Sequence, residues 1–349
     1  MNITFLVGNG FDQSAGLRSS YRQFFEWYCR QPSEKEIVKW FKQEIESDME
    51  NWSDFEAMLG QFTKRFPVEQ AEHFLTCYED AHTGMVNYLN EQERNFGTAI
   101  FAGAVRGGFR DGILNFYREL SPSATATFQQ LVNNNRGANT TVRFLSFNYT
   151  SLLDECVKAA ADQPLSVWNI DNTAKHSFSL SPDVVHVNGT LTKYPTLGLD
   201  DVSQVANREL LSVPGLELQR SIIKPESVAA LGELWHDHAA RIINSSNIIC
   251  VWGMSLGKTD AKWWRQLSNW LAGDKGRQLL LFWHEKDPPG TIFANRRFRY
   301  ESGIRDRFLS FSSMNNVSKQ AIAGRIHIVI NTETVLRVPQ ELRTERADA

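Results

Sequence analysis

The sequence has few cysteines, no long apolar run and no excess of charge of either sign. Its four cysteines are scattered without a C-x-x-C pair, which is typical of reduced, buried thiols and not of disulfides or zinc ligands. No stretch approaches the ~20 apolar residues that cross a bilayer, and the start, MNITFLVGNGFD, lacks the basic segment of an export signal. We therefore expect a cytoplasmic protein with no membrane partner.

The formal net charge of −3 provides no general attraction for nucleic acid, so binding or cleavage of nucleic acid would need a local basic patch. The best candidate is Arg296–Tyr300, continued by Arg305 and Arg307, where arginines alternate with aromatic residues. The alternative is a solvated helix with its aromatic side chains packed inward, and we favour it. A metal site is not predicted either, because His236 and His238, two apart on a predicted helix, would not share a face.

The length of 349 residues and the 42% hydrophobic content allow a large buried core. Six short apolar runs without clean alternation are typical of strands buried on both faces. They are Ile3–Val7, Val142–Phe147, Val184–Val187, Ile248–Trp252, Leu279–Trp283 and Ile326–Ile330. Helical stretches between most of them, such as Ser151–Ala161, Ser227–Asn244 and Thr259–Leu271, are long enough for crossovers. We predict an α/β fold, a Rossmann-like parallel sheet with helices on both faces.

Helical patterns run without a strand signal from about residue 21 to residue 128. They include Glu34–Ile45, Ser53–Phe66 and Val68–Glu93, and Gly107-Gly108 is predicted to break the series. We predict a large helical insertion after the first strand, over residues 21–138, in a core formed by residues 1–20 and 139–349. The charged end Arg343–Ala349 is expected to fray.

Small and amide-bearing residues follow four of the predicted strands. The four segments are Gly8-Asn9-Gly10-Phe11-Asp12, Asn148-Tyr149-Thr150, Asn188-Gly189-Thr190 and Gly253-Met254-Ser255-Leu256-Gly257. The carboxyl ends of parallel strands meet at one edge of the sheet, where such folds bind ligands. Glycine lets the backbone approach a ligand closely, and amide donors at a helix start hold phosphate without a lysine. A nucleotide site is therefore predicted at this edge.

Each segment taken singly also has a structural explanation. Gly8-x-Gly10 is not the full G-x-G-x-x-G pattern, and a tight turn suffices to explain both glycines. Asn148 would cap a helix that begins near Thr150, Ser255 would belong to a turn, and Asp260 would complement a helix dipole. The gathering of four such segments at one edge favours the ligand site.

His186 lies within an apolar run, where a lone histidine is more often a core residue than a catalyst. Because side chains alternate along a strand, His186 and Asn188 should project to the same face. The two residues are therefore considered together.

Several segments, in this order along the chain, resemble the AbiH-type abortive-infection family of phage-defence proteins. They are LVGNGFDQSAGL, SSYRQF, NWSDFEAML, FLSFNYTSLLDE, HVNGT, LGLDDVSQ and VWGMSLGKTD. The resemblance covers roughly residues 1–283, and GNGFD and FNYT are its most specific elements. That family is distantly similar to the sirtuin superfamily, which binds NAD on a Rossmann-like sheet. The resemblance implies NAD or NADP as substrate or ligand, with no metal.

The resemblance also implies roles for individual residues. The catalytic candidates are Asn148, His186 and Asn188, and the cofactor-binding candidates are Gly8, Asn9, Gly10, Asp12, Gly189, Gly253, Ser255 and Asp260. The sequence departs from the sirtuin pattern, because Asn188 stands where those enzymes carry a histidine. An amide takes no proton at neutral pH, and a general base typically contributes ~100- to 10,000-fold, so catalysis would be slow or would use His186.

Three function classes follow. The first is a hydrolase of the nicotinamide–ribose bond of NAD or NADP, kept silent by the helical insertion until a phage-derived trigger arrives. The second is a nucleotide-sensing module that leaves the killing to a defence partner protein, and the third is the nucleic-acid effector considered above. Glu56, from the insertion, is a further candidate to orient ribose hydroxyls or to replace the missing base. The sequence leaves the oligomeric state open, a homo-oligomer included.

Overall fold

The computed structural model describes residues 1–135, 139–162, 165–168, 176–288, 294–332 and 335. Its centre is a seven-stranded sheet with the order β3-β4-β2-β1-β5-β6-β7. The strands are β1 (Asn2–Val7), β2 (Thr140–Ser146), β3 (Leu165–Trp168), β4 (His176–His186), β5 (Ile248–Trp252), β6 (Gln278–Trp283) and β7 (Ile326–Ile330). The six neighbouring strands β4-β2-β1-β5-β6-β7 are mutually parallel, and only the edge strand β3 is antiparallel. The predicted α/β fold is confirmed.

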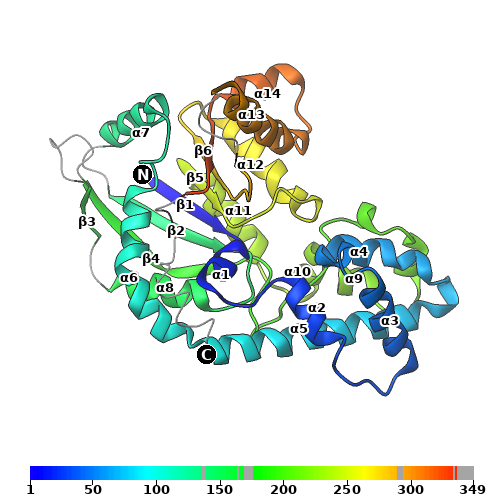
Figure 1. Cartoon of the computed structure of the whole chain (residues 1–349). Coiled ribbons are helices and arrows are strands. Elements are labelled where there is room, and N and C mark those ends of the chain that lie inside the picture. The colour runs from blue at the N-terminus through cyan, green and yellow to red at the C-terminus, as the bar shows by residue number, and fades with distance from the viewer. Residues whose placement is uncertain (136–138, 163–164, 169–175, 289–293, 333–334, 336–349) are drawn as a thin grey trace.

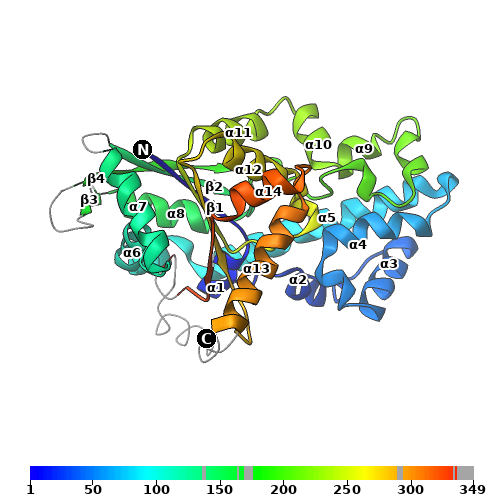
Figure 2. The same ribbon diagram turned by 90° about the horizontal axis from the view of Figure 1, so that it is seen from above.

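Helices cover both faces of this sheet, which is why the central strands β1, β5 and β6 are buried along nearly their whole length. On β1, Ile3 and Phe5 point into one apolar layer and Leu6 points into the other. The first layer is closed by α6 (Thr98–Asn115) and α8 (Leu152–Ala161), together with α1 (Gly10–Ala15) and α7 (Pro122–Asn134). The second is closed by α11 (Trp235–Ser245), α12 (Ala261–Gly273), α13 (Ala294–Ser310) and α14 (Asn316–Ala323). Figure 2 shows the two sets of helices on either side of the strands.

A second lobe of helices extends to one side of the sheet (Figure 1). It contains α2 (Tyr21–Tyr28), α3 (Glu36–Ser47), α4 (Phe55–Phe62) and α5 (Ala71–Phe96), with α9 (Leu218–Ile222) and α10 (Lys224–Ala230) beside them. Short 3₁₀ helices lie at Asn51–Ser53, Thr63–Arg65, Val68–Gln70, Val202–Gln204, Arg208–Ser212 and Lys258–Asp260. The long helix α5, about 39 Å at 1.5 Å per residue, runs back from this lobe to the sheet. The predicted helical stretch after the first strand is confirmed.

The apolar side chains of this lobe form their own cluster, which is rich in aromatic rings. It includes Phe25, Trp52 and Phe55 from the insertion, and also Leu199 and Ile222 from the segment after β4. Later helices of the insertion, α6 and α7, pack instead against the sheet. The division into an insertion, residues 21–138, and a core, residues 1–20 with 139–349, stays a prediction, and the packing adds that each lobe draws residues from both ranges.

The predicted break at Gly107-Gly108 is wrong, because α6 passes through both glycines without interruption. The chain breaks at Gly97 instead, whose φ of +67° ends α5. Phe101 and Phe109 of α6 are buried on the sheet side, and this burial outweighs the roughly 1 kcal/mol that each glycine costs a helix.

The predicted helix Ser227–Asn244 is likewise divided in two. It is interrupted between α10 and α11, near Gly232, where φ is +68°. The strand expected at Val184–Val187 begins earlier, at His176, and the edge strand β3 was not predicted at all. None of the described helices is long and apolar enough to cross a membrane.

Candidate functional site

A cavity of about 1030 Å³ opens at the carboxyl ends of the parallel strands. Its walls include residues that follow β1, β2, β4, β5, β6 and β7, namely Gly8, Asn148, Asn188, Gly253, His284 and Asn331. Tyr21, Glu56 and Met85 of the helical lobe close the opposite side. The cavity surrounds the position where β1 has β2 on one side and β5 on the other, so that the chain order reverses. Open parallel sheets bind ligands at such a position, and the volume is at the upper end for small-molecule sites.

The three glycines at the base of the cavity are required by the packing of two turns against each other. A Cβ on Gly10 would lie 2.6 Å from Cα of Gly253, and a Cβ on Gly8 would lie 2.7 Å from the carbonyl oxygen of Gly253. The amide of Gly10 donates to that same oxygen at 2.8 Å. Gly253 itself has a φ of +67°, a conformation that favours glycine. The glycines therefore join the turns after β1 and β5, and all three also line the cavity.

Asp12 is the centre of a buried polar cluster beside this base. Its Oδ1 accepts a hydrogen bond from Nδ2 of Asn148 at 3.0 Å, and its Oδ2 accepts one from the hydroxyl of Thr150 at 2.5 Å. Burial raises the pKa of Asp12 to about 7, although these two hydrogen bonds act in the opposite direction. All three side chains line the cavity, and a carboxyl group of this pKa can exchange a proton near neutral pH.

Asn148 does not cap a helix, since α8 begins at Leu152 with Ser151 at its N-cap position. Its Nδ2 also donates to the carbonyl oxygen of Gly8 at 3.2 Å, which ties β2 to the turn after β1. Its Oδ1 is buried and has no hydrogen-bond partner among the described residues. Asn148 is therefore oriented by its donor atom and retains an unused acceptor at the cavity wall.

His186 does not line the cavity. Its Nδ1 donates to the carbonyl oxygen of Asn148 and its Nε2 pairs with Oδ2 of Asp154, both at 2.8 Å. Burial lowers the pKa of His186, but the hydrogen bond and charge of Asp154 outweigh it and leave the pKa above its usual value. Both ring nitrogens are thus occupied, and the geometry gives His186 the position of a support for Asn148.

Asn188 and Gly189 both follow β4, but only Asn188 lines the cavity. Asn188 is 6% exposed and lines the cavity, whereas Gly189 lies outside the lining. Gly189 has a φ of +76°, and a Cβ there would lie 2.2 Å from the carbonyl oxygen of Tyr194. Gly189 is therefore required by its turn.

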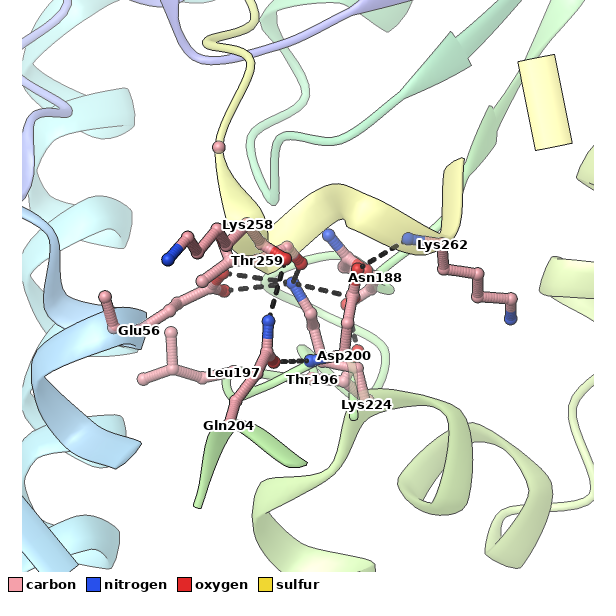
Figure 3. A network of polar contacts seen from close by, with 12 residues as sticks. Glu56, Asn188, Thr196, Leu197, Asp200, Gln204, Lys224, Lys258, Thr259 and Lys262 are labelled. Carbon is pink, nitrogen blue, oxygen red and sulfur yellow. Dashed lines mark hydrogen bonds and ion pairs between the residues drawn. The ribbon is translucent and has the colours of Figure 1, made fainter. Parts of the chain in front are cut away.

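Lys224 organises a buried ionic network at the end of the cavity nearest the helical lobe. Its Nζ lies 3.0 Å from Oε2 of Glu56 and 3.5 Å from Oδ1 of Asp200, and it donates to the carbonyl oxygen of Thr259 at 3.3 Å. Figure 3 shows Glu56 reaching from α4 toward Lys224, with Asp200 on the other side. Burial lowers the pKa of Lys224, but the charges of Glu56 and Asp200 outweigh it and raise that pKa well above its usual value. The lysine is therefore a permanent cation that joins the two lobes.

Asp260 lies next in sequence to Thr259 and lines the same end of the cavity. It holds the N-cap position of α12, but its side chain makes no cap hydrogen bond. Burial raises the pKa of Asp260 to about 7, with Lys224 acting against the rise and Asp200 and Glu56 adding to it. Ser255 also lines the cavity.

Asn9 stabilises the entrance to the helical lobe. Its side chain accepts from the hydroxyl of Ser19, and its Nδ2 donates to the carbonyl oxygen of Ser19 at 2.8 Å. Over the described part of the chain, the backbone amides of Asn9, Gly253 and Ser255 donate no hydrogen bond. These amides are available to the oxygen atoms of a ligand.

The structure adds cavity residues that the sequence did not single out as a set. Tyr21, Lys224 and His284 were missed, and Glu56, raised only as a hypothesis, lies in the lining. The nearest signal for Lys224 is a lysine placed directly after two isoleucines. Three of the four cysteines, Cys77, Cys156 and Cys250, are buried as expected, and Cys29 is partly exposed.

The basic segment Arg296–Tyr300 belongs to α13, as expected for a helix. Its aromatic residues behave differently from each other. Phe298 is 68% exposed, whereas the hydroxyl of Tyr300 accepts from Nε1 of Trp283 and donates to Glu285. The prediction that both aromatic rings pack inward is therefore wrong for Phe298.

Comparison with known proteins identifies a family for the chain. A family model described as "Bacteriophage abortive infection AbiH" matches residues 4–282, which include the loops after β1, β2, β4 and β5. No curated protein matches the chain. The match spans most of the chain, and the protein accordingly belongs to the AbiH family of bacteriophage abortive-infection proteins, which act in phage defence.

Proposed function

We propose that the cavity binds NAD or NADP and that the protein hydrolyses the bond between nicotinamide and ribose. The observation that carries this proposal is the cavity of about 1030 Å³ at the point where the strand order reverses. A Rossmann-like sheet binds dinucleotides at this position. The likeness to sirtuins, which the sequence indicates at Gly8, Asn148 and Gly253, supports the same ligand. In phage defence, loss of the dinucleotide would arrest the infected cell.

The polar lining fits the separate parts of such a ligand. The backbone amides of Asn9, Gly253 and Ser255 are suited to phosphate oxygens, because they have no acceptor among the described residues. A carboxylate such as that of Glu56 is suited to ribose hydroxyls, since a carboxylate only accepts hydrogen bonds. The phosphates and sugars would thus occupy different ends of the cavity.

Hydrolysis needs a group that takes a proton from the attacking water. The oxygen of this water bonds to the ribose carbon, the bond from that carbon to nitrogen breaks, and its electron pair passes to the ring nitrogen of nicotinamide. Asp12 and Asp260 line the cavity with pKa values of about 7, which is the range for a general base at neutral pH. Either carboxylate could replace the histidine that is absent at position 188, and neither requires His186 to move.

One observation favours nucleotide sensing without turnover as a second candidate function. His186, two residues before the sirtuin-like position 188, has both ring nitrogens hydrogen-bonded and lies outside the lining. A cavity that binds but does not react would then report the nucleotide to a defence partner.

The test is to incubate the purified protein with NAD and NADP, to follow nicotinamide and ADP-ribose by chromatography, and to measure binding by calorimetry. Asn148→Ala removes the amide that orients Asp12, and Asn295→Ala, at an exposed position of α13, is the matched control. Release that falls by roughly 100-fold or more in Asn148→Ala alone supports hydrolysis. Binding without release supports sensing. If neither binding nor release is detected, even with phage lysate added, both functions are ruled out.

A further inference from the structure

The end of the cavity nearest the helical lobe carries more negative than positive charge. Glu56, Asp200 and Asp260 surround Lys224, closely enough that their charges act on one another, and the charge of Lys262 also acts on Asp200. Asp54, at the start of α4, adds a fourth carboxylate. Lys224 uses its donors on Glu56, Asp200 and the carbonyl oxygen of Thr259, so it cannot also neutralise Asp260 by a hydrogen bond. An excess of negative charge at a cavity wall favours a positively charged ligand.

The carboxylate of Asp260 faces this end without a partner. No hydrogen bond or ion pair to its side chain occurs in the described part of the structure, and it lines the cavity. A metal ion would need several carboxylates converging on one point, and within the described ranges no group of three or more such side chains does so. The free carboxylate is instead suited to a charge spread over an organic group.

Two tyrosines frame the same end. Tyr21 and Tyr149 both line the cavity, and both lie within electrostatic reach of Glu56 and Asp260. The hydroxyl of Tyr149 donates to the carbonyl oxygen of Thr196 at 3.0 Å, which leaves its ring at the cavity wall. Aromatic rings beside carboxylates are the usual recognition elements for an organic cation.

Asn188 supplies a second and independent indication. Its side chain is nine-tenths buried at the cavity wall, and its carboxamide makes no hydrogen bond to any described residue. Only its backbone oxygen is used, as the acceptor for the amide and hydroxyl of Thr196 at 2.8 and 3.0 Å. A carboxamide offers one acceptor and two donors, which match another carboxamide.

We infer that this end of the cavity is the subsite for the oxidised nicotinamide ring, with Asp260 and the tyrosines facing its positive charge and Asn188 pairing with its carboxamide. The inference rests on the proposed function and makes it more specific, because the ligand is the oxidised, cationic dinucleotide and not the neutral reduced form. The phosphates then lie toward the turns after β1 and β5. This orientation places the bond to be broken between Asp260 and the Asp12–Asn148 pair, which line the cavity with it.

The test compares ligands that differ by this one charge. NAD⁺ and NADH are titrated into the full-length protein, together with the fragments 1-methylnicotinamide, which is cationic, and nicotinamide, which is neutral. We expect each cationic ligand to bind at least roughly tenfold more tightly than its neutral counterpart. Asp260→Asn should remove most of this preference, whereas Asp306→Asn, which removes an exposed charge on α13, should retain it.

A separate variant tests the carboxamide. Asn188→Ala should abolish the difference in affinity between 1-methylnicotinamide and 1-methylpyridinium, which has the charge but lacks the carboxamide. This measurement decides the role of Asn188 even where Asp260→Asn does not fold.

The outcomes separate the two proposals. Equal or tighter binding of NADH would overturn the subsite while leaving nucleotide binding in place. If neither dinucleotide binds, the proposed function fails, and the fragments still decide the subsite. If 1-methylnicotinamide binds more tightly than nicotinamide and Asp260→Asn removes this preference, the subsite is supported. Equal affinity for the two fragments would refute the subsite.

Discussion

Replacing Lys224 with methionine removes the cation that pairs with both Glu56 and Asp200 and leaves these buried carboxylates without that ion pair. Lys224 is 2% exposed, and the side chains of Glu56 and Asp200 that face it are 11% and 3% exposed. Breaking a buried ion pair by removing one partner typically costs about 3–5 kcal/mol, because the remaining charge is buried and uncompensated. At ~2 °C per kcal/mol for a chain of this size, the melting temperature should fall by about 6–10 °C at pH 7.5.

The loss should depend on pH in a defined direction. Burial raises the pKa of Glu56, and Lys224 opposes that rise, so the pKa of Glu56 in Lys224→Met should rise further. A carboxyl group with a raised pKa binds more protons in the folded state than in the unfolded state. The variant should therefore regain stability as the pH falls from 7.5 to 5, because the carboxylates become neutral.

The assay is thermal unfolding followed by circular dichroism at pH 5, 6 and 7.5. Lys158→Met is the control, since Lys158 is 61% exposed and its pair with Glu155 on α8 should contribute less than about 1 kcal/mol. Adding Glu56→Gln to Lys224→Met should restore part of the loss. A decrease below about 2 °C, or one that does not change with pH, would refute this account of the network.

Three further outcomes are expected. Gly10→Ala should lower the melting temperature and abolish ligand binding, because its Cβ would lie 2.6 Å from Cα of Gly253. Gly107→Ala on α6, whose Cβ would meet no atom within 4 Å, should instead stabilise the protein by about 0.5–1 kcal/mol in thermal unfolding. Asp154→Asn should lower the pKa of His186 in a proton NMR titration. Because that pKa is raised in the folded protein, the variant should lose more stability at pH 6 than at pH 8.5, and equal losses at the two pH values would contradict the pairing. Binding of NAD⁺ should tighten between pH 6 and 8 as Asp260, with a pKa of about 7, loses its proton beside Lys224, Asp200, Glu56 and Asp54, and calorimetry of Asp260→Asn should show a weaker dependence on pH.

The sequence by itself determined the parallel part of the sheet and the edge at which the cavity lies. The apolar runs Ile3–Val7 and Ile248–Trp252 predict buried parallel strands because helices must cover both of their faces, and the structure confirms them. Parallel strands bring their carboxyl ends to one edge, so the segments after β1, β2, β4 and β5 were expected to meet, and residues from all four line the cavity. Patterns of this kind are local, which is why they can be read along the chain.

Only the tertiary structure decided which side chains face the cavity and which support it. His186 and Asn188 were expected to project to the same face, but the hydrogen bonds of His186 to Asp154 and to the backbone of Asn148 hold its ring outside the lining. Gly107 was expected to break a helix, and the packing of α6 against the sheet prevents the break.

The network of Lys224 shows the physical reason most directly. Glu56 and Lys224 are separated by 168 positions in the sequence, and they meet because the segment after β4 packs into the aromatic core of the helical lobe. The energy of a charge depends on its burial and on the partner that the fold places within a few ångströms, and neither is written in the neighbouring residues. The sequence predicted the edge of the sheet at which the cavity lies, and the fold determined the charge of that cavity.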